Sequence, residues 1–188
     1  MPRLVLVPRW SGTADSDFYP WLRAELAPRG VDIAVAELLP VKDAPEIEPT
    51  VEPIVKLLAE RPTEPVGLAP SAGCRPAPRA LARRSADVPP VRGAVLVAAW
   101  LHIDSPWPTI LPWTTTPFDA ARARAGVTEL HALLSDDDPF TADHEATRAE
   151  LEQLGARVSI PPGAKPFTAA PQPAVLAALE ALLAAAAC

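Results

Sequence analysis

Proline is the feature that most limits what this chain can fold into. The sequence holds 25 prolines in 188 residues and only 8 glycines. A proline inside a helix removes a backbone hydrogen bond and clashes with the preceding turn, so helices longer than about a dozen residues are hard to place. The runs between prolines are apolar, and apolar residues make up 49% of the chain, which argues against a flexible low-complexity segment. A bundle of long helices is therefore excluded.

Short apolar runs alternate with segments of helical periodicity. The strand-like runs are Arg3–Val7, Asp32–Ala36, Pro65–Ala69, Ala94–Ala98, Thr128–Leu134 and Arg157–Ile160. The helix-like segments are Phe18–Ala27, Pro49–Ala59, Asp143–Leu154 and Pro173–Ala186. Apolar strands separated by helices indicate a parallel sheet covered on both faces. We predict a single domain over residues 1–188, a three-layer, doubly wound α/β fold with a mostly parallel sheet of about six strands.

Charge and cysteine content exclude several classes of protein. The net charge of −6 disfavours nucleic acid as a partner, because such proteins present a basic face. Cys74 and Cys188 cannot form a disulfide framework, and no apolar run reaches the ~20 residues that span a bilayer. The start of the chain lacks the long apolar core of a signal peptide. We expect a cytoplasmic protein without a membrane segment; no protein partner is indicated.

The sharpest local motif runs from Gly67 to Cys74 and reads GLAPSAGC. It follows a predicted strand and should open a helix, which is the context of a nucleophile elbow with Ser71 at its tip. Small residues are needed on both sides of such a serine, and Ala69 and Gly73 meet that need. The start of the helix would add positive potential for an oxyanion. The alternative interpretation is that Ser71 only caps the next helix.

A second motif, SDDDPF, occupies Ser135–Phe140 and follows the fifth predicted strand. α/β-Hydrolases carry their catalytic acid at this place, after the serine in chain order. The alternative is a solvated acidic turn, with Asp143 and His144 nearby. Consecutive carboxylates cannot all face one cation, so we expect no metal site and no cofactor.

Five segments fall in the order of one known family. They are PWL at Pro20–Leu22, PSAGC at the serine, VLVAAWL at Val95–Leu101, SDDDPF, and PGAKPFTA at Pro162–Ala169. The chain resembles the small serine hydrolases of the retinoblastoma-binding-protein-nine and YdeN type over nearly its whole length. The resemblance implies a compact α/β-hydrolase fold without a large cap, and hydrolysis of esters or amides by a Ser-Asp-His triad. By position, Ser71 matches the nucleophile and Asp138 the acid.

The chain departs from that family at three active-site positions. Pro166 stands where the family has the catalytic histidine, and Pro70 replaces the histidine that usually precedes the serine. The segment Pro8-Arg9-Trp10 replaces the usual glycine after the first strand, so the oxyanion groups would come from Arg9, Trp10 and Ala72. Proline cannot accept a proton, and loss of the base costs about 10⁶ in turnover in other serine hydrolases. We expect weak or absent hydrolysis.

Two residues are candidates to replace the missing base. His102 follows the fourth strand, with Asp104 two residues on, and a histidine facing solvent is the alternative there. Lys165 lies beside the base position; desolvation would lower its pKa and let it act as a base or Schiff-base nucleophile, unless it is a surface lysine. His131 is expected inside a strand, and His144 at an exposed helix start.

The long irregular stretch 101–118 is typical of a binding loop. Trp100, Trp107 and Trp113, with Trp10, are expected to line an apolar pocket at the same sheet edge, and Arg9 and Arg75 to favour a small apolar or anionic ligand. Pro76 and Pro78 require the helix after Ser71 to restart near Pro76 or to be distorted.

Three hypotheses remain: a hydrolase with an unconventional base, a non-catalytic binding or interaction protein, and a designed or remodelled hydrolase scaffold, which the alanine-rich end would fit.

Overall fold

A parallel sheet forms the centre of the computed structural model, which describes residues 1–37, 46–60, 64–85, 87–162, 164 and 167–184. In this part of the chain the sheet has six strands in the order β2-β1-β3-β4-β5-β6, and all neighbours pair in parallel. The strands are β1 (Arg3–Leu6), β2 (Asp32–Val35), β3 (Val66–Pro70), β4 (Val91–Val97), β5 (Val127–Leu133) and β6 (Arg157–Ser159). Each corresponds to one predicted strand, with ends displaced by up to a few residues.

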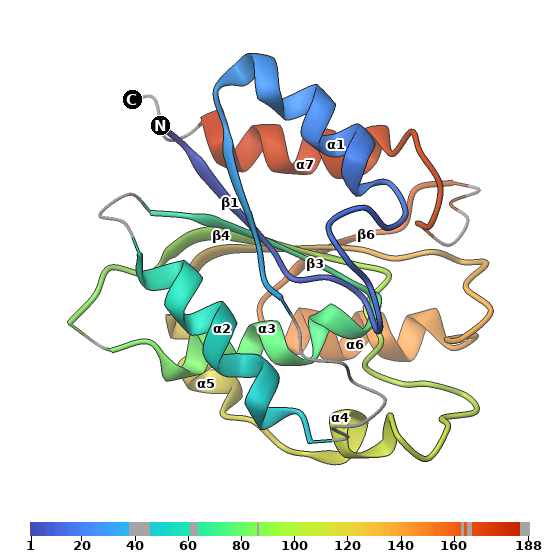
Figure 1. The fold of residues 1–188 in the computed structure, drawn as a ribbon. Helices are drawn as coiled ribbons and strands as arrows, with labels where there is room; N and C mark the ends of the chain where they lie inside the picture. Colours follow the sequence, from blue (N-terminus) through green and yellow to red (C-terminus); the bar gives the residue numbers. More distant parts are fainter. Residues whose placement is uncertain (38–45, 61–63, 86, 163, 165–166, 185–188) are drawn as a thin grey trace.

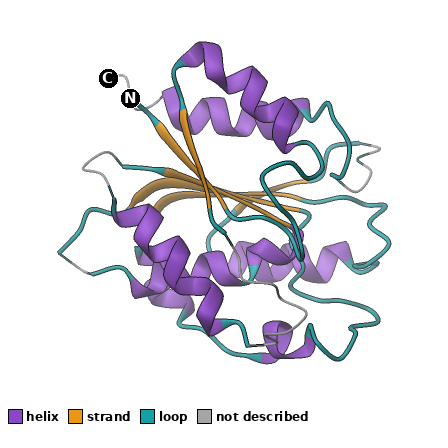
Figure 2. Cartoon of the chain, in the orientation of Figure 1, coloured by secondary structure: helices purple, strands orange, loops and turns teal. Residues whose placement is uncertain are grey.

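Helices cover both faces of this sheet, which confirms the three-layer α/β prediction (Figures 1 and 2). One face carries α1 (Tyr19–Leu26) and α7 (Pro173–Ala184). The opposite face carries α2 (Glu48–Ala59), α3 (Pro76–Arg83), α5 (Ala120–Ala125) and α6 (His144–Gln153). Within the described ranges, no helix is both long and apolar enough to cross a bilayer.

Several helices begin at or next to a proline, although Pro53 lies inside α2. α1, α2, α3 and the short α4 (Leu111–Thr115) each have a proline at one of their first two positions. Proline is tolerated there because those N–H groups have no acceptor within the helix. After Ser71 the chain makes a 3-10 turn, Ser71–Cys74, and α3 begins at Pro76, so the helix does restart at that proline. The high proline content is therefore compatible with short, proline-initiated helices.

Two short helices were not predicted. α4 interrupts the irregular stretch 101–118, and α5 has the sequence AARARA, which offers no apolar periodicity. The side chain of Asp119 caps α5 by accepting a hydrogen bond from the Arg122 backbone N–H at 2.9 Å. Only Ala123 is buried in this helix. Its position is thus set by packing against α3 rather than by its own pattern.

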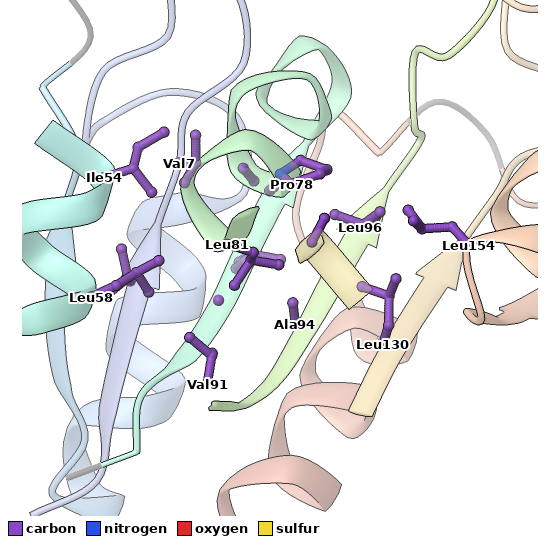
Figure 3. A pocket seen from close by; sticks show the side chains of 16 residues that line it. Val7, Ile54, Leu58, Pro78, Leu81, Val91, Ala94, Leu96, Leu130 and Leu154 are labelled. Carbon is purple, nitrogen blue, oxygen red and sulfur yellow. The ribbon is translucent and has the colours of Figure 1, made fainter. Parts of the chain in front are cut away.

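The core between the sheet and α2, α3, α5 and α6 contains a small apolar cavity (Figure 3). The cavity has a volume of about 20 Å³, and its walls include Val7, Ile54, Leu81 and Leu130. A space of this size has room for about one water molecule. A cavity lined only by apolar groups, however, stays dry. It is a packing defect next to the small residue Gly67, and it offers no polar group for chemistry.

Candidate functional site

A larger cavity, of about 320 Å³, lies at the carboxyl ends of the central strands. β1 lies between β2 and β3, so the order of the strands reverses beside the ends of β1 and β3. Ligands of open α/β sheets bind at such a switch point. The residues that follow these two strands, Arg9 and Trp10 after β1 and Ser71 after β3, line the cavity. We call it the Ser71 cavity.

Ser71 has an unusual backbone conformation. Its φ is +51°, whereas Pro70 before it is extended and the residues after it form a 3-10 turn. A residue with a Cβ atom rarely adopts a positive φ, and such strain persists where the surrounding structure enforces it. Gly73 makes the turn possible, because a Cβ at that position would lie 2.5 Å from the carbonyl oxygen of Val7. The chain therefore bends sharply between β3 and α3, with Ser71 at the bend.

Backbone strain is concentrated around this cavity. Among the described residues other than glycine, those with positive φ are Ser11, Asp17, Ser71 and Ala98. Asp17, Ser71 and Ala98 all line the Ser71 cavity, and Ser11 directly follows Trp10 in its wall. Strained backbone of this kind clusters at active sites and ligand clamps. The distribution marks this cavity as the candidate functional site.

Asp138 lies in the wall of the same cavity and is 8% exposed. Burial raises the pKa of its carboxyl group, and the charge of Asp104 acts in the same direction. Hydrogen bonds from the Phe140 backbone N–H, at 2.9 Å, and from the Trp100 side chain act against that rise in pKa. The Asp138 carboxylate is therefore held by an amide and an indole.

None of the chain's three histidines lines the Ser71 cavity. The Nε2 atom of His102 lies 3.0 Å from Glu150, and that of His131 lies 3.3 Å from Glu129 on the same strand. His144 begins α6, with its Nε2 3.7 Å from Glu145. His102 thus lies beside the carboxylate of Glu150, whereas its alternative interpretation was a histidine facing solvent. Pro166 and Lys165 lie outside the described residues.

The groups expected to stabilise an oxyanion differ in their surroundings. The Arg9 backbone N–H donates to the Tyr19 hydroxyl at 3.2 Å, so it already has an acceptor. The Arg9 side chain donates to Asp17 at 2.6 Å and to the Trp10 carbonyl at 2.8 Å. Ala72 is fully buried at the start of the 3-10 turn, where backbone N–H groups lack an acceptor within the turn. Among these groups, the Ala72 N–H therefore stays the predicted oxyanion donor.

Three of the four expected tryptophans line the cavity. The ring of Trp10 lies edge-to-face against Trp107, with centroids 5.7 Å apart, and Trp107 meets Trp100 in the same way at 5.9 Å. Trp113 differs from the expectation: it is fully buried and packs behind Trp10 at 4.9 Å, outside the lining. α4 holds it in a cluster with Ile47, Ala72 and Ile110.

Arg75 also differs from the expectation, because it does not reach the Ser71 cavity. Its side chain is directed toward α4 and donates to the carbonyls of Trp113 and Thr114, at 2.8 and 2.6 Å. Conversely, Phe140, Phe167 and Thr168 line the cavity, although the sequence analysis did not select them as site residues. All three belong to the two most specific motifs, SDDDPF and PGAKPFTA, so a signal was present. Asp17 carried no such signal.

Nowhere in the described part of the chain do three or more metal-binding side chains gather.

Comparison with known proteins finds similarity in structure only. No family model and no curated protein matches the sequence. The solved structure of YdeN from B. subtilis superposes with a TM-score of 0.83 at 17% identity, covering 98% of this chain and 100% of that one. Est1E from Butyrivibrio proteoclasticus gives 0.75 at 11% identity, covering 99% and 88%. The type II thioesterase BorB gives 0.60 at 20% identity, covering 97% and 91%. The chain therefore has a small α/β-hydrolase fold.

Proposed function

We propose that the Ser71 cavity is a serine-hydrolase site that lacks its general base and cleaves small carboxylic esters only slowly. The observation that carries this proposal is the position of Ser71. It lies at a strained turn after β3 and opens, with Asp138, into a cavity whose lining includes no histidine. A nucleophile elbow paired with an acid would have these features, and the position of the base in the resembled family holds Pro166.

The chemistry expected from this arrangement is acyl transfer without efficient proton removal. The Ser71 oxygen attacks the ester carbonyl and its proton passes to water. The carbon–oxygen bond to the leaving alcohol then breaks, and water later releases the acid from the serine. A triad histidine normally accepts and returns these protons. Without it, an oxyanion donor such as the Ala72 N–H and binding in the cavity still supply about 10³–10⁴ over the reaction in water.

The walls of the cavity support a substrate with a small aromatic or short apolar body. Three tryptophan rings, Trp10, Trp100 and Trp107, form much of the wall, and Phe140 and Phe167 add to it. A volume of about 320 Å³ lies at the lower end of the range for small-molecule sites. A solved structure of Est1E holds ferulic acid, an aromatic acid, which agrees with this class of ligand.

A non-catalytic binding function is the second candidate. The same aromatic walls would hold a ligand without cleaving it, and the Arg9–Asp17 ion pair at 2.6 Å gives the site a polar edge. The two candidates differ in one property, which is whether Ser71 forms a covalent bond with an electrophile.

A fluorophosphonate probe makes that distinction. We expect the wild-type protein to be labelled slowly, Ser71→Ala not to be labelled, and Ser105→Ala, a change at an exposed serine, to label like the wild type. Intact-protein mass spectrometry measures the adduct. Labelling that persists in Ser71→Ala would contradict the assignment of the nucleophile. A wild-type protein that never labels would favour the binding function.

A further inference from the structure

A third cavity, of about 350 Å³, is lined by residues of helices that lie on the opposite side of the sheet from α1 and α7. α3 and α6 contribute to its wall, together with the segment that leads into α5. Figure 1 shows these helices on one face of the sheet. None of the residues that line this cavity lines the Ser71 cavity. We call it the Arg75 cavity, after the one cationic side chain among the described residues of its wall.

Arg75 is only 9% exposed, and its hydrogen bonds go to neutral groups. The Nε and Nη2 atoms donate to the carbonyls of Trp113 and Thr114. A guanidinium has five N–H donors, so these two bonds leave the Nη1 group without an acceptor in the described part of the chain. That donor group belongs to a side chain in the wall of an open cavity.

A second buried guanidinium lies one helical turn further along α3. Arg79 is 3% exposed and donates to the carbonyls of Arg75, at 2.7 Å, and Thr116. Its guanidinium also lies over the ring of Phe118, at 5.3 Å from the ring centre. Burial, together with the charge of Arg75, lowers the pKa of Arg79 to about 10. The two arginines therefore place two positive charges close together in a poorly solvated region.

The positive charges of Arg75 and Arg79 are only partly compensated by a nearby carboxylate. Glu150 is the one carboxylate in the wall of the Arg75 cavity, and its side chain is half exposed. It is also 3.0 Å from the Nε2 atom of His102. A buried charge is costly unless an opposite charge compensates it. One half-exposed carboxylate does not fully compensate Arg75 in the wall and the buried Arg79 close behind it, so a further anion beside Arg75 would be stabilised.

We propose that the Arg75 cavity binds an amphipathic monocarboxylate, independently of the proposed function of Ser71. The carboxylate accepts hydrogen bonds from Arg75, whose planar donors match its geometry. The apolar body packs against Leu96, Phe118 and Leu151, which form much of the remaining wall. A doubly charged phosphate is disfavoured, because the apolar wall and Glu150 offer its second charge no partner.

Calorimetric titration with octanoate, and with its neutral analogue octanamide, tests this proposal in the full chain. We expect octanoate to bind at least about tenfold more tightly, since a charge-assisted hydrogen bond is roughly twice as strong as a neutral one. Arg75→Gln should reduce octanoate affinity to that of octanamide. Glu150→Gln should increase it several-fold, because a repelling carboxylate is removed. Arg122→Gln, at an exposed arginine on α5, is the matched control and should bind octanoate like the wild type.

Further variants locate the bound octanoate and separate it from the Ser71 proposal. Ser71→Ala should bind octanoate like the wild type, whereas Ala120→Phe, which narrows the Arg75 cavity without removing a charge, should weaken binding. Backbone NMR shifts should change around Leu101 and Leu151 and not around Trp107. Equal affinities for octanoate and octanamide, undiminished binding to Arg75→Gln, shifts centred on Trp107, or no binding up to ~10 mM would each overturn the proposal.

Discussion

At Asp138, burial and hydrogen bonding act in opposite directions on one carboxyl group. Burial is the largest influence and raises the pKa above its ordinary value near 3.8, while the donors from Phe140 and Trp100 oppose it. The ionised form is therefore less favoured in the folded protein than in the unfolded chain. In the family that the chain resembles, a histidine would accompany this acid. Here Trp100 supplies an indole N–H that can orient the carboxylate but cannot transfer its proton.

The stability of an Asp138→Asn variant should reveal this shift. A carboxyl group with a raised folded-state pKa loses stability as the pH rises from its unfolded-state value through its folded-state value, and contributes no further change above that. The asparagine does not titrate. We expect the free energy of unfolding of Asp138→Asn, relative to wild type, to increase as the pH rises from below 3.8 and then to level off. Urea titrations at a series of pH values measure it; a difference that falls with pH would contradict the account.

The segment formed by β3, the 3-10 turn and α3 contains two glycines. One has room for a side chain, whereas the other does not. A Cβ at Gly67 would meet its nearest neighbour, the Ala94 Cβ, at 3.5 Å, an ordinary contact, and Gly67 lies beside the small core cavity. A Cβ at Gly73 would approach the Val7 carbonyl oxygen at 2.5 Å, far inside a normal contact. The first glycine is thus replaceable, whereas the second holds the turn against the end of β1.

Alanine at these two positions should have opposite effects on stability. Gly67→Ala is expected to stabilise the protein by about 0.4–1 kcal/mol, because it restricts the unfolded chain and adds a methyl group beside a void. Gly73→Ala should destabilise it by about 1–3 kcal/mol, because the turn must shift away from β1. Chemical denaturation measures both. A Gly73→Ala variant as stable as the wild type would contradict the close contact between position 73 and β1.

At the scale of elements, the sequence predicts what depends on local pattern. Short apolar or alternating runs predicted the described strands, and small residues around Ser71 predicted the bend. α5 was missed because an alternation of alanine and arginine carries no apolar face. The direction of Arg75 and the burial of Trp113 were also mispredicted. Both depend on how the 3-10 turn rotates the start of α3 and on how α4 folds back, and neither is encoded in residue spacing.

Across the whole molecule, Cys74 reports on the integrity of the fold. It is 1% exposed and ends the 3-10 turn that begins at Ser71, and its thiol donates to the Ala69 carbonyl at 2.8 Å. Burial raises its pKa to about 12, so the reactive thiolate is absent at neutral pH. Its position between sheet and helices means that a reagent reaches it only when the layers separate.

Thiol labelling in a Cys188→Ser background tests this view, since Cys74 is then the one cysteine. We expect no reaction with an aromatic disulfide reagent under native conditions and full reaction in denaturant. The labelling rate should follow the unfolding transition seen by circular dichroism. Rapid labelling without denaturant would show that the layers open locally around the Ser71 turn, contrary to the packing described.

The proposed serine-hydrolase site in the Ser71 cavity would lack its general base. Hydrolysis of p-nitrophenyl butyrate by wild type, Pro166→His and the double variant Pro166→His/Ser71→Ala tests this claim most directly. General acid–base catalysis contributes about 10²–10⁴ in rate, so Pro166→His should raise kcat/KM by at least about 10². The double variant should lose that gain. Wild-type turnover already at about 1–10³ s⁻¹, the usual range for enzymes, or no gain in Pro166→His, would contradict the claim.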